Sequence, residues 1–300
     1  MKKLAALLLL ASLTAATAAS RDNLIAPENL LWPAGITDNI VNYERQNIMR
    51  SYDYSHPDAP LGTCRVYSNV SAPTYFLYQP DPQKNTRVAM VVLPGGAYTD
   101  IWLDTEGHDI ALYFKNLGIT SLVLKYRTNT ADSDGNTPLT MEQYLPAAIA
   151  DAKQAVKILR SSADKLDIDP NKIGIGGFSA GAHLALSVCL EPETENKISR
   201  PNFAFLIYPG LDEDIDPKLT AAKTVPPLFI VNGQQDTVTP PDKCALFFAK
   251  LCEKNTPAEL HIYRKGNHGF TLGIQKGNST STWPKSFISF LKDIDIIEQK

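Results

Sequence analysis

The chain has 300 residues, and its 29 Lys and Arg against 32 Asp and Glu give a formal net charge of −3. This mildly acidic balance excludes the electrostatic signature of a nucleic-acid-binding protein. The length, less a leader described next, suits one α/β domain with a full core better than two small domains.

Residues 1–18 have the layout of a secretory signal peptide. Lys2 and Lys3 form a basic start, residues 4–13 are almost wholly apolar, and residues 16–18 fit an A-x-A cleavage site. The apolar run is short for a bilayer span, and an uncleaved anchor is the alternative reading. We expect an exported protein, secreted or periplasmic. Elsewhere no apolar run approaches membrane-spanning length, so the sequence predicts no membrane partner.

Residues 19–60 lack clear periodicity and are expected to form an N-terminal arm laid over the domain. The remaining residues, 61–300, are predicted to form one α/β domain. Its first segment, residues 61–81, predicts one or two edge strands.

From Arg87 onward, apolar runs alternate with helical patterns. The predicted strands are rich in Val, Ile and Leu with little polar alternation, as in strands covered on both faces, and they span residues 88–94, 119–126, 172–178, 202–209, 227–233 and 258–266. The predicted helices span residues 107–116, 141–166, 179–190, 240–253 and 283–297. Such alternation predicts a mainly parallel central sheet with helices on both faces. Two long loops, residues 127–140 and 211–226, are expected to shape a site.

The four cysteines do not have the spacing of a disulfide framework. Cys244 and Cys252 are predicted on one helix, where eight residues rise about 12 Å, too far for a bond. We expect buried free thiols, with a Cys64–Cys189 disulfide as the alternative that an exported protein permits. Neither a CxxC motif nor paired histidine–carboxylate spacing occurs, so the sequence predicts no metal site.

Residues 177–181, GFSAG, match the G-x-S-x-G pattern of a nucleophile elbow. The match follows a predicted strand and opens a predicted helix, where a sharp turn lifts the serine hydroxyl above the sheet edge. Ser179 is therefore the candidate nucleophile. The alternatives are a serine that caps a helix in an ordinary glycine-rich turn, or a phosphate-binding turn, although the full G-x-G-x-x-G register is missing.

An acyl-transfer enzyme also needs backbone N–H groups that stabilise an oxyanion. The loop after the first long strand, LPGGAY, supplies a glycine-rich turn at the expected place. We predict Gly96, Ala97 and Ala180 as the oxyanion-hole donors. A plain Pro-Gly-Gly turn is the alternative for this loop.

The base must be a histidine that a carboxylate orients. His268 follows the last predicted strand, at the sheet edge where catalytic groups of open α/β sheets gather. Asp236 follows the preceding strand in the same way, and Asp242, already in the next helix, is the weaker candidate acid. The order Ser179, Asp236, His268 is that of the α/β-hydrolase triad.

The other four histidines are weaker candidates for the base. His183 lies one helical turn beyond Ser179, but its helix runs away from the elbow, so we expect local hydrogen bonds to satisfy it. His261 lies inside a predicted strand and is expected to be structural. His56 belongs to the arm, and His108 belongs to a helix start.

These motifs together resemble the α/β-hydrolase esterases grouped with acetylxylan and feruloyl esterases. The resemblance rests on segments in the family's order along nearly the whole chain after the leader, among them LLWPAG, LPGGAY, GIGGFSAGAHLAL, PLFIVNGQQDTVTP and AELHIYRKGNHGF. It implies the α/β-hydrolase fold, with Ser179, Asp236 and His268 as the triad and residues 95–97 as the oxyanion loop. Ala97 stands where relatives often have a third glycine, and a backbone N–H survives that change.

The resemblance implies an exported serine esterase that removes small acyl groups, acetyl above all, from polysaccharides or oligosaccharides without a cofactor. Its partner is then an acylated carbohydrate, which Tyr98 and Trp102 are candidates to contact, although both aromatics could equally belong to the core. The alternatives are a general short-chain carboxylesterase, a feruloyl esterase, a serine peptidase of the same fold and a non-catalytic carbohydrate-binding relative.

Overall fold

The computed structural model describes residues 24–36, 48–52, 64–129, 139–192, 197–211, 215–272 and 279–298 of the chain. The expected signal peptide, residues 1–18, lies outside the described residues, as does His56.

Within the described residues, eight strands form a central sheet in the order β1-β4-β7-β5-β8-β9-β10-β11. The six strands from β7 to β11 in this order run parallel, and β4 and β1 continue the sheet in antiparallel fashion. The bounds are β1 Glu28–Leu30, β4 Thr74–Tyr78, β5 Ala89–Leu93, β7 Thr120–Lys125, β8 Ile173–Phe178, β9 Phe203–Ile207, β10 Leu228–Gly233 and β11 Ala258–Tyr263. The predicted mainly parallel sheet is confirmed, and its central strands β5, β7, β8, β9 and β10 are wholly buried.

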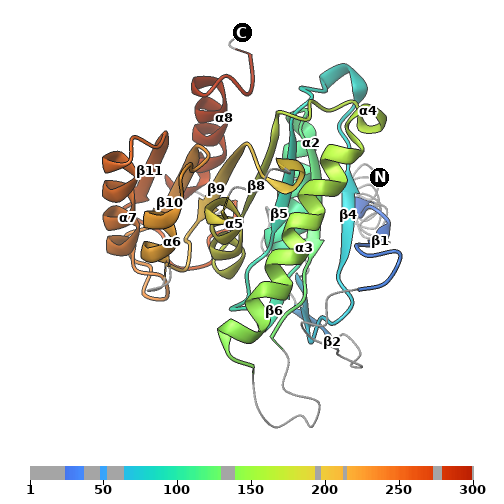
Figure 1. The fold of residues 1–300 in the computed structure, drawn as a ribbon, viewed down its shortest axis with the longest axis horizontal. Helices are drawn as coiled ribbons and strands as arrows, with labels where there is room; N and C mark the ends of the chain where they lie inside the picture. The colour runs from blue at the N-terminus through green and yellow to red at the C-terminus, as the bar shows by residue number, and fades with distance from the viewer. Residues whose placement is uncertain are drawn as a thin grey trace, which may run out of the picture.

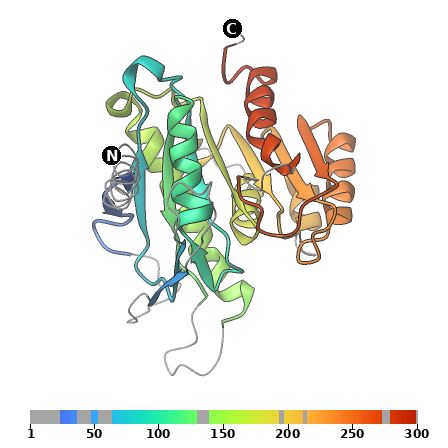
Figure 2. The same cartoon turned by 180° about the vertical axis from the view of Figure 1, so that it is seen from behind.

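Helices cover both faces of this sheet. Figures 1 and 2, which view opposite sides, show α3 and α5 on one face and α2 and α8 on the other. The helices are α2 Asp109–Asn116, α3 Met141–Ser161, α4 Ala163–Leu166, α5 Ala180–Leu190, α6 Ile215–Ala221, α7 Pro241–Glu253 and α8 Trp283–Asp293. Short 3₁₀ turns span Pro82–Lys84, Lys197–Ser199 and Ser279–Thr282. Helix α3 begins with a capping box, in which Thr140 and Gln143 satisfy backbone N–H groups reciprocally.

The segment expected to be an arm contributes strands where it is described. Strand β1 pairs with β4 and takes the sheet edge, so β4 is not the edge strand that the sequence predicts. Strand β2 (Ile48–Tyr52) joins β3 (Cys64–Ser68) and β6 (Asp100–Trp102) in a separate three-stranded sheet. The side chains of β1 are all exposed, so the strand shows no alternation in the sequence. Besides the backbone pairing, the Glu28 carboxylate contacts Thr74 of β4 and Lys125 of β7.

Two helical segments also differ from the sequence prediction. The helix expected from residue 107 begins as a π-helical turn, Asp104–His108, that continues into α2. Residues 211–226, expected to be a loop, contain α6, whose Pro217 sits at the third helical position, where proline is tolerated.

All four cysteines are free in the structure; the prediction of buried free thiols is confirmed for three of them and is wrong for Cys252, which is exposed. Cys64, Cys189 and Cys244 are buried, whereas Cys252 is exposed and shares α7 with Cys244. Burial raises the pKa of the Cys64 thiol to about 11, which keeps it protonated and unreactive at neutral pH. In the described part of the chain, no helix has the length and apolar character needed to cross a membrane.

Candidate active site

Ser179 lies at the sharp turn between β8 and α5, with φ 52° and ψ −118°. The two flanking glycines are required by close backbone approach. A Cβ at Gly177 would lie 2.4 Å from Leu93 O, and one at Gly181 would lie 2.1 Å from the same oxygen. The helix can therefore begin directly beneath β5 only if both positions are glycine. The predicted nucleophile elbow is present.

The structure brings Ser179, Asp236 and His268 together, although 89 residues separate the first from the last. His268 Nε2 is 2.9 Å from Ser179 Oγ, and His268 Nδ1 is 2.8 Å from Asp236 Oδ2. Asp236 is buried, with its Oδ1 accepting hydrogen bonds from Val238 N and Thr239 N at 2.9 Å each. These bonds hold the carboxylate so that its other oxygen faces the imidazole. The arrangement can move a proton from Ser179 to His268 while Asp236 stabilises the imidazolium.

The acid and histidine loops meet because two glycines touch. A Cβ at Gly233, the last residue of β10, would lie 2.2 Å from Gly266 O. Gln235 N also donates to Gly266 O at 3.2 Å. Asp236 and His268 follow these glycines by three and two residues. Asp242, the weaker candidate acid, lies in the first turn of α7 and makes none of the contacts to His268.

The predicted oxyanion loop has three consecutive residues with positive φ, namely Gly96 (134°), Ala97 (53°) and Tyr98 (62°). Gly96 O accepts hydrogen bonds from Thr99 N and Asp100 N, which closes the loop into a tight turn. Gly96 and Ala97 line the cavity beside Ser179, and Ala180 begins α5, where the first N–H groups of a helix have no intrahelical partner. Successive N–H groups in such a turn suit a developing negative charge.

A cavity of about 490 Å³ opens at the triad. Trp102, predicted as a substrate contact, lines it together with Thr99, Asp100 and Val238. Tyr98, the other predicted contact, does not. Its side chain is 4% exposed, and its hydroxyl hydrogen-bonds His183 Nδ1 at 2.5 Å. Tyr98 therefore belongs to the core.

The remaining described histidines have structural environments. The His183 imidazole is hydrogen-bonded to Tyr98, as expected for a structural histidine, but the partner is 85 residues away in the chain and not local as predicted. His261 bonds Glu259 at 2.5 Å and stacks on Tyr263. His108 is fully buried against Tyr78, and desolvation lowers its pKa to about 3. None of these three imidazoles hydrogen-bonds the Ser179 hydroxyl, which leaves His268 as the candidate base.

Sequence reasoning missed Glu106, a buried carboxyl that also lines this cavity. It comes from the π-helical turn before α2, and it hydrogen-bonds Gly95 N and Tyr208 Oη. Burial raises its pKa, against the opposing effects of Tyr208, Gly95 and the nearby His268. The turn's polar sequence, DTEGH, gives no sign of burial, so only the fold reveals this residue.

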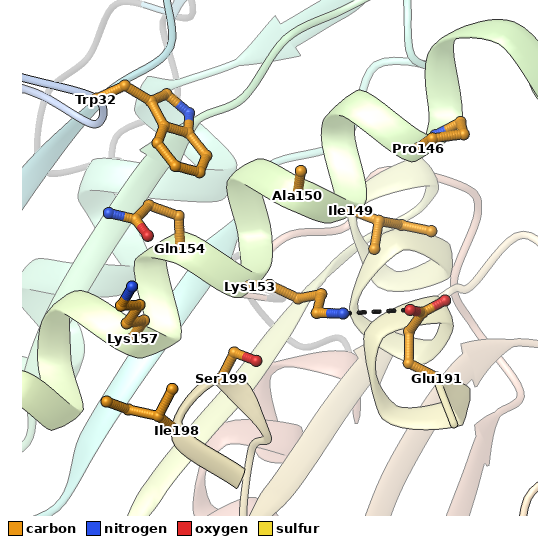
Figure 3. A pocket seen from close by; sticks show the side chains of 10 residues that line it. All are labelled: Trp32, Pro146, Ile149, Ala150, Lys153, Gln154, Lys157, Glu191, Ile198 and Ser199. Carbon is orange, nitrogen blue, oxygen red and sulfur yellow. Dashed lines mark hydrogen bonds and ion pairs between the residues drawn. The ribbon is translucent and has the colours of Figure 1, made fainter. Parts of the chain in front are cut away.

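A second hollow, of about 540 Å³, runs along the outer side of α3. Figure 3 shows Trp32 on one side of it and the Lys153–Glu191 ion pair on the other. The residues that line it include no member of the triad or of the oxyanion loop. Although this hollow is the larger, Ser179 and His268 line the 490 Å³ cavity, which is therefore the candidate active site. No group of three or more His, Cys, Asp or Glu side chains in the described ranges is arranged to hold a metal ion.

Two family descriptions match overlapping parts of the chain. Residues 138–224, which include Ser179, match the family described as alpha/beta hydrolase fold. Residues 214–294, which include Asp236 and His268, match the prolyl oligopeptidase family.

Two curated proteins are similar to most of the chain. Endo-1,4-beta-xylanase B of Butyrivibrio fibrisolvens is 28% identical over 259 residues, which cover 76% of this chain and 38% of that protein. The acetylxylan esterase of Xylanibacter ruminicola is 27% identical over 241 residues, covering 71% of this chain and 45% of the relative. The chain thus spans less than half the length of these two relatives.

Among solved structures, an acetyl ester-xyloside bifunctional hydrolase from Caldicellulosiruptor lactoaceticus superposes with a TM-score of 0.64 at 25% identity. The match covers 91% of this chain and 98% of that structure. The esterase Est2 of Thermogutta terrifontis shares the fold, with a TM-score of 0.63 at 24% identity. That match covers 79% of this chain and 94% of the Est2 chain. Sequence and fold agree on an α/β-hydrolase fold, and the chain is similar to esterases of this fold that are related to acetylxylan esterases and acetyl ester-xyloside hydrolases.

Proposed function

We propose that the protein is an exported serine esterase that hydrolyses small acyl esters, acetyl above all, on polysaccharides or oligosaccharides. The observation that carries the esterase activity is the hydrogen-bonded chain Asp236–His268–Ser179 beside a turn of positive-φ residues at Gly96 and Ala97. Export is supported by the signal-peptide pattern of residues 1–18.

The mechanism follows from the contacts. His268 Nε2 takes the Ser179 proton as Oγ attacks the ester carbonyl carbon, and the carbonyl oxygen becomes an oxyanion facing Gly96 N–H, Ala97 N–H and Ala180 N–H. When the intermediate collapses, the alcohol leaves with the proton from His268. A water molecule, activated by His268, then splits the acyl-enzyme into the carboxylic acid and free Ser179. This cycle requires no cofactor.

The preference for acylated carbohydrate is supported by the cavity and by the relatives. An aromatic side chain, Trp102, and polar side chains, Thr99 and Asp100, line the space beside the nucleophile. An aromatic face with hydroxyl and carboxylate groups suits a sugar ring, which has apolar faces and a polar rim. Two of the relatives carry acetylxylan esterase and acetyl ester-xyloside hydrolase in their names.

The test is the release of acetate from acetylated xylan. For Ser179→Ala we expect a fall in kcat of roughly 10⁴-fold or more, because the acyl-enzyme cannot form. The matched control is Ser187→Ala, a buried serine of the same helix α5 that does not line the cavity; it should retain activity. Acetate release that survives Ser179→Ala at the wild-type rate would refute the proposed mechanism.

The match of residues 214–294 to the prolyl oligopeptidase family favours a serine peptidase as the second candidate. A panel of acetyl, butyryl and feruloyl esters and prolyl peptides separates the two. We expect the highest kcat/KM on acetyl esters. Faster cleavage of the peptides would favour the second candidate.

A further inference from the structure

Glu106 connects two parts of the active site that come from different strands. Its side chain, 6% exposed, lines the cavity at the triad. Glu106 Oε2 accepts a hydrogen bond from Gly95 N at 2.7 Å, and Oε1 accepts one from Tyr208 Oη, also at 2.7 Å. Both carboxyl oxygens are therefore engaged by protein donors.

Gly95 is the first residue of the oxyanion loop, and its contacts are tight. A Cβ at Gly95 would lie 2.8 Å from Glu106 Oε2 and 3.0 Å from Ser179 Cβ. Trp102 N donates to Gly95 O at 3.1 Å. The position of Gly96 and Ala97 relative to Ser179 thus depends on how Gly95 is held, and Glu106 holds its N–H.

Tyr208, which follows β9, links Glu106 to the region around His268. Its hydroxyl accepts a hydrogen bond from Thr271 N at 3.2 Å, and its ring centroid is 4.8 Å from that of His268. Its carbonyl lies 3.1 Å from Thr239 Oγ1, which is 2.9 Å from Asp236 Oδ2. A displacement of Tyr208 would therefore change the positions of both His268 and Asp236.

We propose that Glu106 is a positioning residue that fixes the oxyanion loop relative to His268 by bridging Gly95 and Tyr208, and that it acts through these hydrogen bonds and not through a negative charge. The inference rests on the proposed function, since oxyanion stabilisation matters only for acyl transfer.

The chemistry of the site favours an uncharged bridge. A carboxylate beside the cavity would repel the oxyanion that forms at Gly96 and Ala97, so a neutral carboxyl suits catalysis better. The buried position of Glu106 shifts its pKa upward, in the same direction. A neutral carboxyl keeps both contacts, because its carbonyl oxygen accepts from Gly95 and its hydroxyl can donate to Tyr208 Oη.

Two substitutions separate position from charge. In Glu106→Gln, the amide oxygen can accept from Gly95 and the amide NH₂ can donate to Tyr208, so we expect kcat within about threefold of the wild type. Glu106→Leu keeps a similar volume but removes both contacts. For it we expect kcat to fall about 10²-fold with KM within about twofold, because the loss appears in the transition state.

The experiment measures kcat and KM on p-nitrophenyl acetate for the wild type, both Glu106 variants, Tyr208→Phe and Asp104→Asn. Tyr208→Phe removes one arm of the bridge and should lower kcat about tenfold, which keeps the inference testable if Glu106→Leu does not fold. Asp104 is the matched control, a buried acid of the same turn that pairs with Arg65 and does not line the cavity. Asp104→Asn should lower stability and leave kcat unchanged.

Three outcomes would overturn the inference. A Glu106→Gln variant as inactive as Glu106→Leu would show that the charge is required. Wild-type kcat in both Glu106→Leu and Tyr208→Phe would show that the bridge is dispensable. A fall in kcat for Asp104→Asn that equals the fall for Glu106→Leu would show a general packing effect.

The rate at which a fluorophosphonate phosphonylates Ser179 distinguishes failure of this inference from failure of the proposed function. This reaction also places oxygen charge at the oxyanion loop, and it needs no acyl substrate. If the wild type hydrolyses no acyl ester but is phosphonylated about 10²-fold faster than Glu106→Leu, the positioning role stands and the proposed function fails. Equal phosphonylation rates would refute the positioning role itself.

Discussion

At the scale of single residues, Ser179 occupies a backbone conformation that a serine adopts only when its surroundings hold it. Its N–H donates to Ile207 O at 3.0 Å, and its carbonyl accepts from His183 N at 3.0 Å. A positive φ at a non-glycine residue costs on the order of 1–3 kcal/mol, which these contacts and the packing of α5 must offset. The result is a hydroxyl already within 2.9 Å of its base.

Asp236→Asn tests whether the carboxylate, beyond its shape, is needed. The variant keeps an oxygen that can accept from Val238 N and Thr239 N, so the loop should stay in place. Its amide would donate to His268 Nδ1 and favour the tautomer with a proton on Nε2, which cannot accept the Ser179 proton. We expect kcat on an acetyl ester to fall by about 10³–10⁴-fold with little change in Tm. Asp242→Asn, on the exposed start of α7, should leave kcat unchanged. More than a tenth of wild-type kcat in Asp236→Asn would contradict this role.

The triad could be predicted from the sequence because each member has a local signature. Ser179 lies in a glycine-bounded turn, and Asp236 and His268 follow apolar strands that end in glycine-containing loops. Glu106 and Tyr98 could not be assigned in this way. Whether a polar side chain faces a cavity or the core depends on packing between distant segments, as the contact of Tyr98 with His183 illustrates.

At the scale of elements, β10 and β11 are adjacent parallel strands, and their loops meet at Gly233 and Gly266. Gly233→Ala places a methyl group 2.2 Å from Gly266 O, where backbone must move to accommodate it. We expect a shift between Asp236 and His268 that lowers kcat about 10²-fold, and a loss of about 1–3 kcal/mol in the free energy of unfolding. Activity assays and urea unfolding measure the two effects.

The control for this substitution is Gly210→Ala, because the nearest atom to the added methyl group is His183 Cβ at an ordinary 3.8 Å. It should change neither kcat nor the free energy of unfolding appreciably. Equal effects of the two substitutions would contradict the importance of the Gly233–Gly266 contact.

The elements that the sequence predicted are those whose periodicity comes from burial. Strands β5, β7, β8, β9 and β10 are buried on both faces and are read as continuous apolar runs. Strand β1 has three exposed residues and is defined by its pairing with β4. The π-helical turn at 104–108 is wholly buried despite its polar sequence, because Asp104 is satisfied by Arg65 of β3. Such pairings are long-range and leave no periodic pattern.

At the scale of the whole molecule, the site is assembled from both halves of the sheet. The proposed oxyanion loop follows β5 and the proposed nucleophile follows β8, whereas the proposed acid and base follow β10 and β11. Because these strands are parallel, their carboxyl ends meet at one edge, and chain order becomes spatial order around the cavity. The fold class could be predicted because alternating strands and helices allow few topologies.

Global stability should also depend on a group remote from catalysis, His108. It is buried between Tyr78, Phe76 and Asp104, with its Nδ1 2.8 Å from Tyr78 Oη. Desolvation, aided by the nearby positive charge of Arg65, lowers its pKa from 6.5 to about 3. Below pH 6.5 the unfolded chain binds a proton that the folded protein does not, so the contribution of His108 to stability is complete above pH 6.5 and is lost progressively down to about pH 3.

We therefore expect the free energy of unfolding to fall by about 1.4 kcal/mol per pH unit from this group, or about 2 kcal/mol between pH 6.5 and 5. His108→Gln removes the titration while keeping a polar group that can bond Tyr78. Urea unfolding at pH 6.5 and 5 should show a decrease smaller by about 2 kcal/mol in the variant than in the wild type. The raised pKa values of Glu106 and Asp151 act in the opposite sense, because they favour the folded state at low pH, but both proteins share them and they cancel in the difference. Equal decreases in the two proteins would show that His108 becomes protonated within the fold.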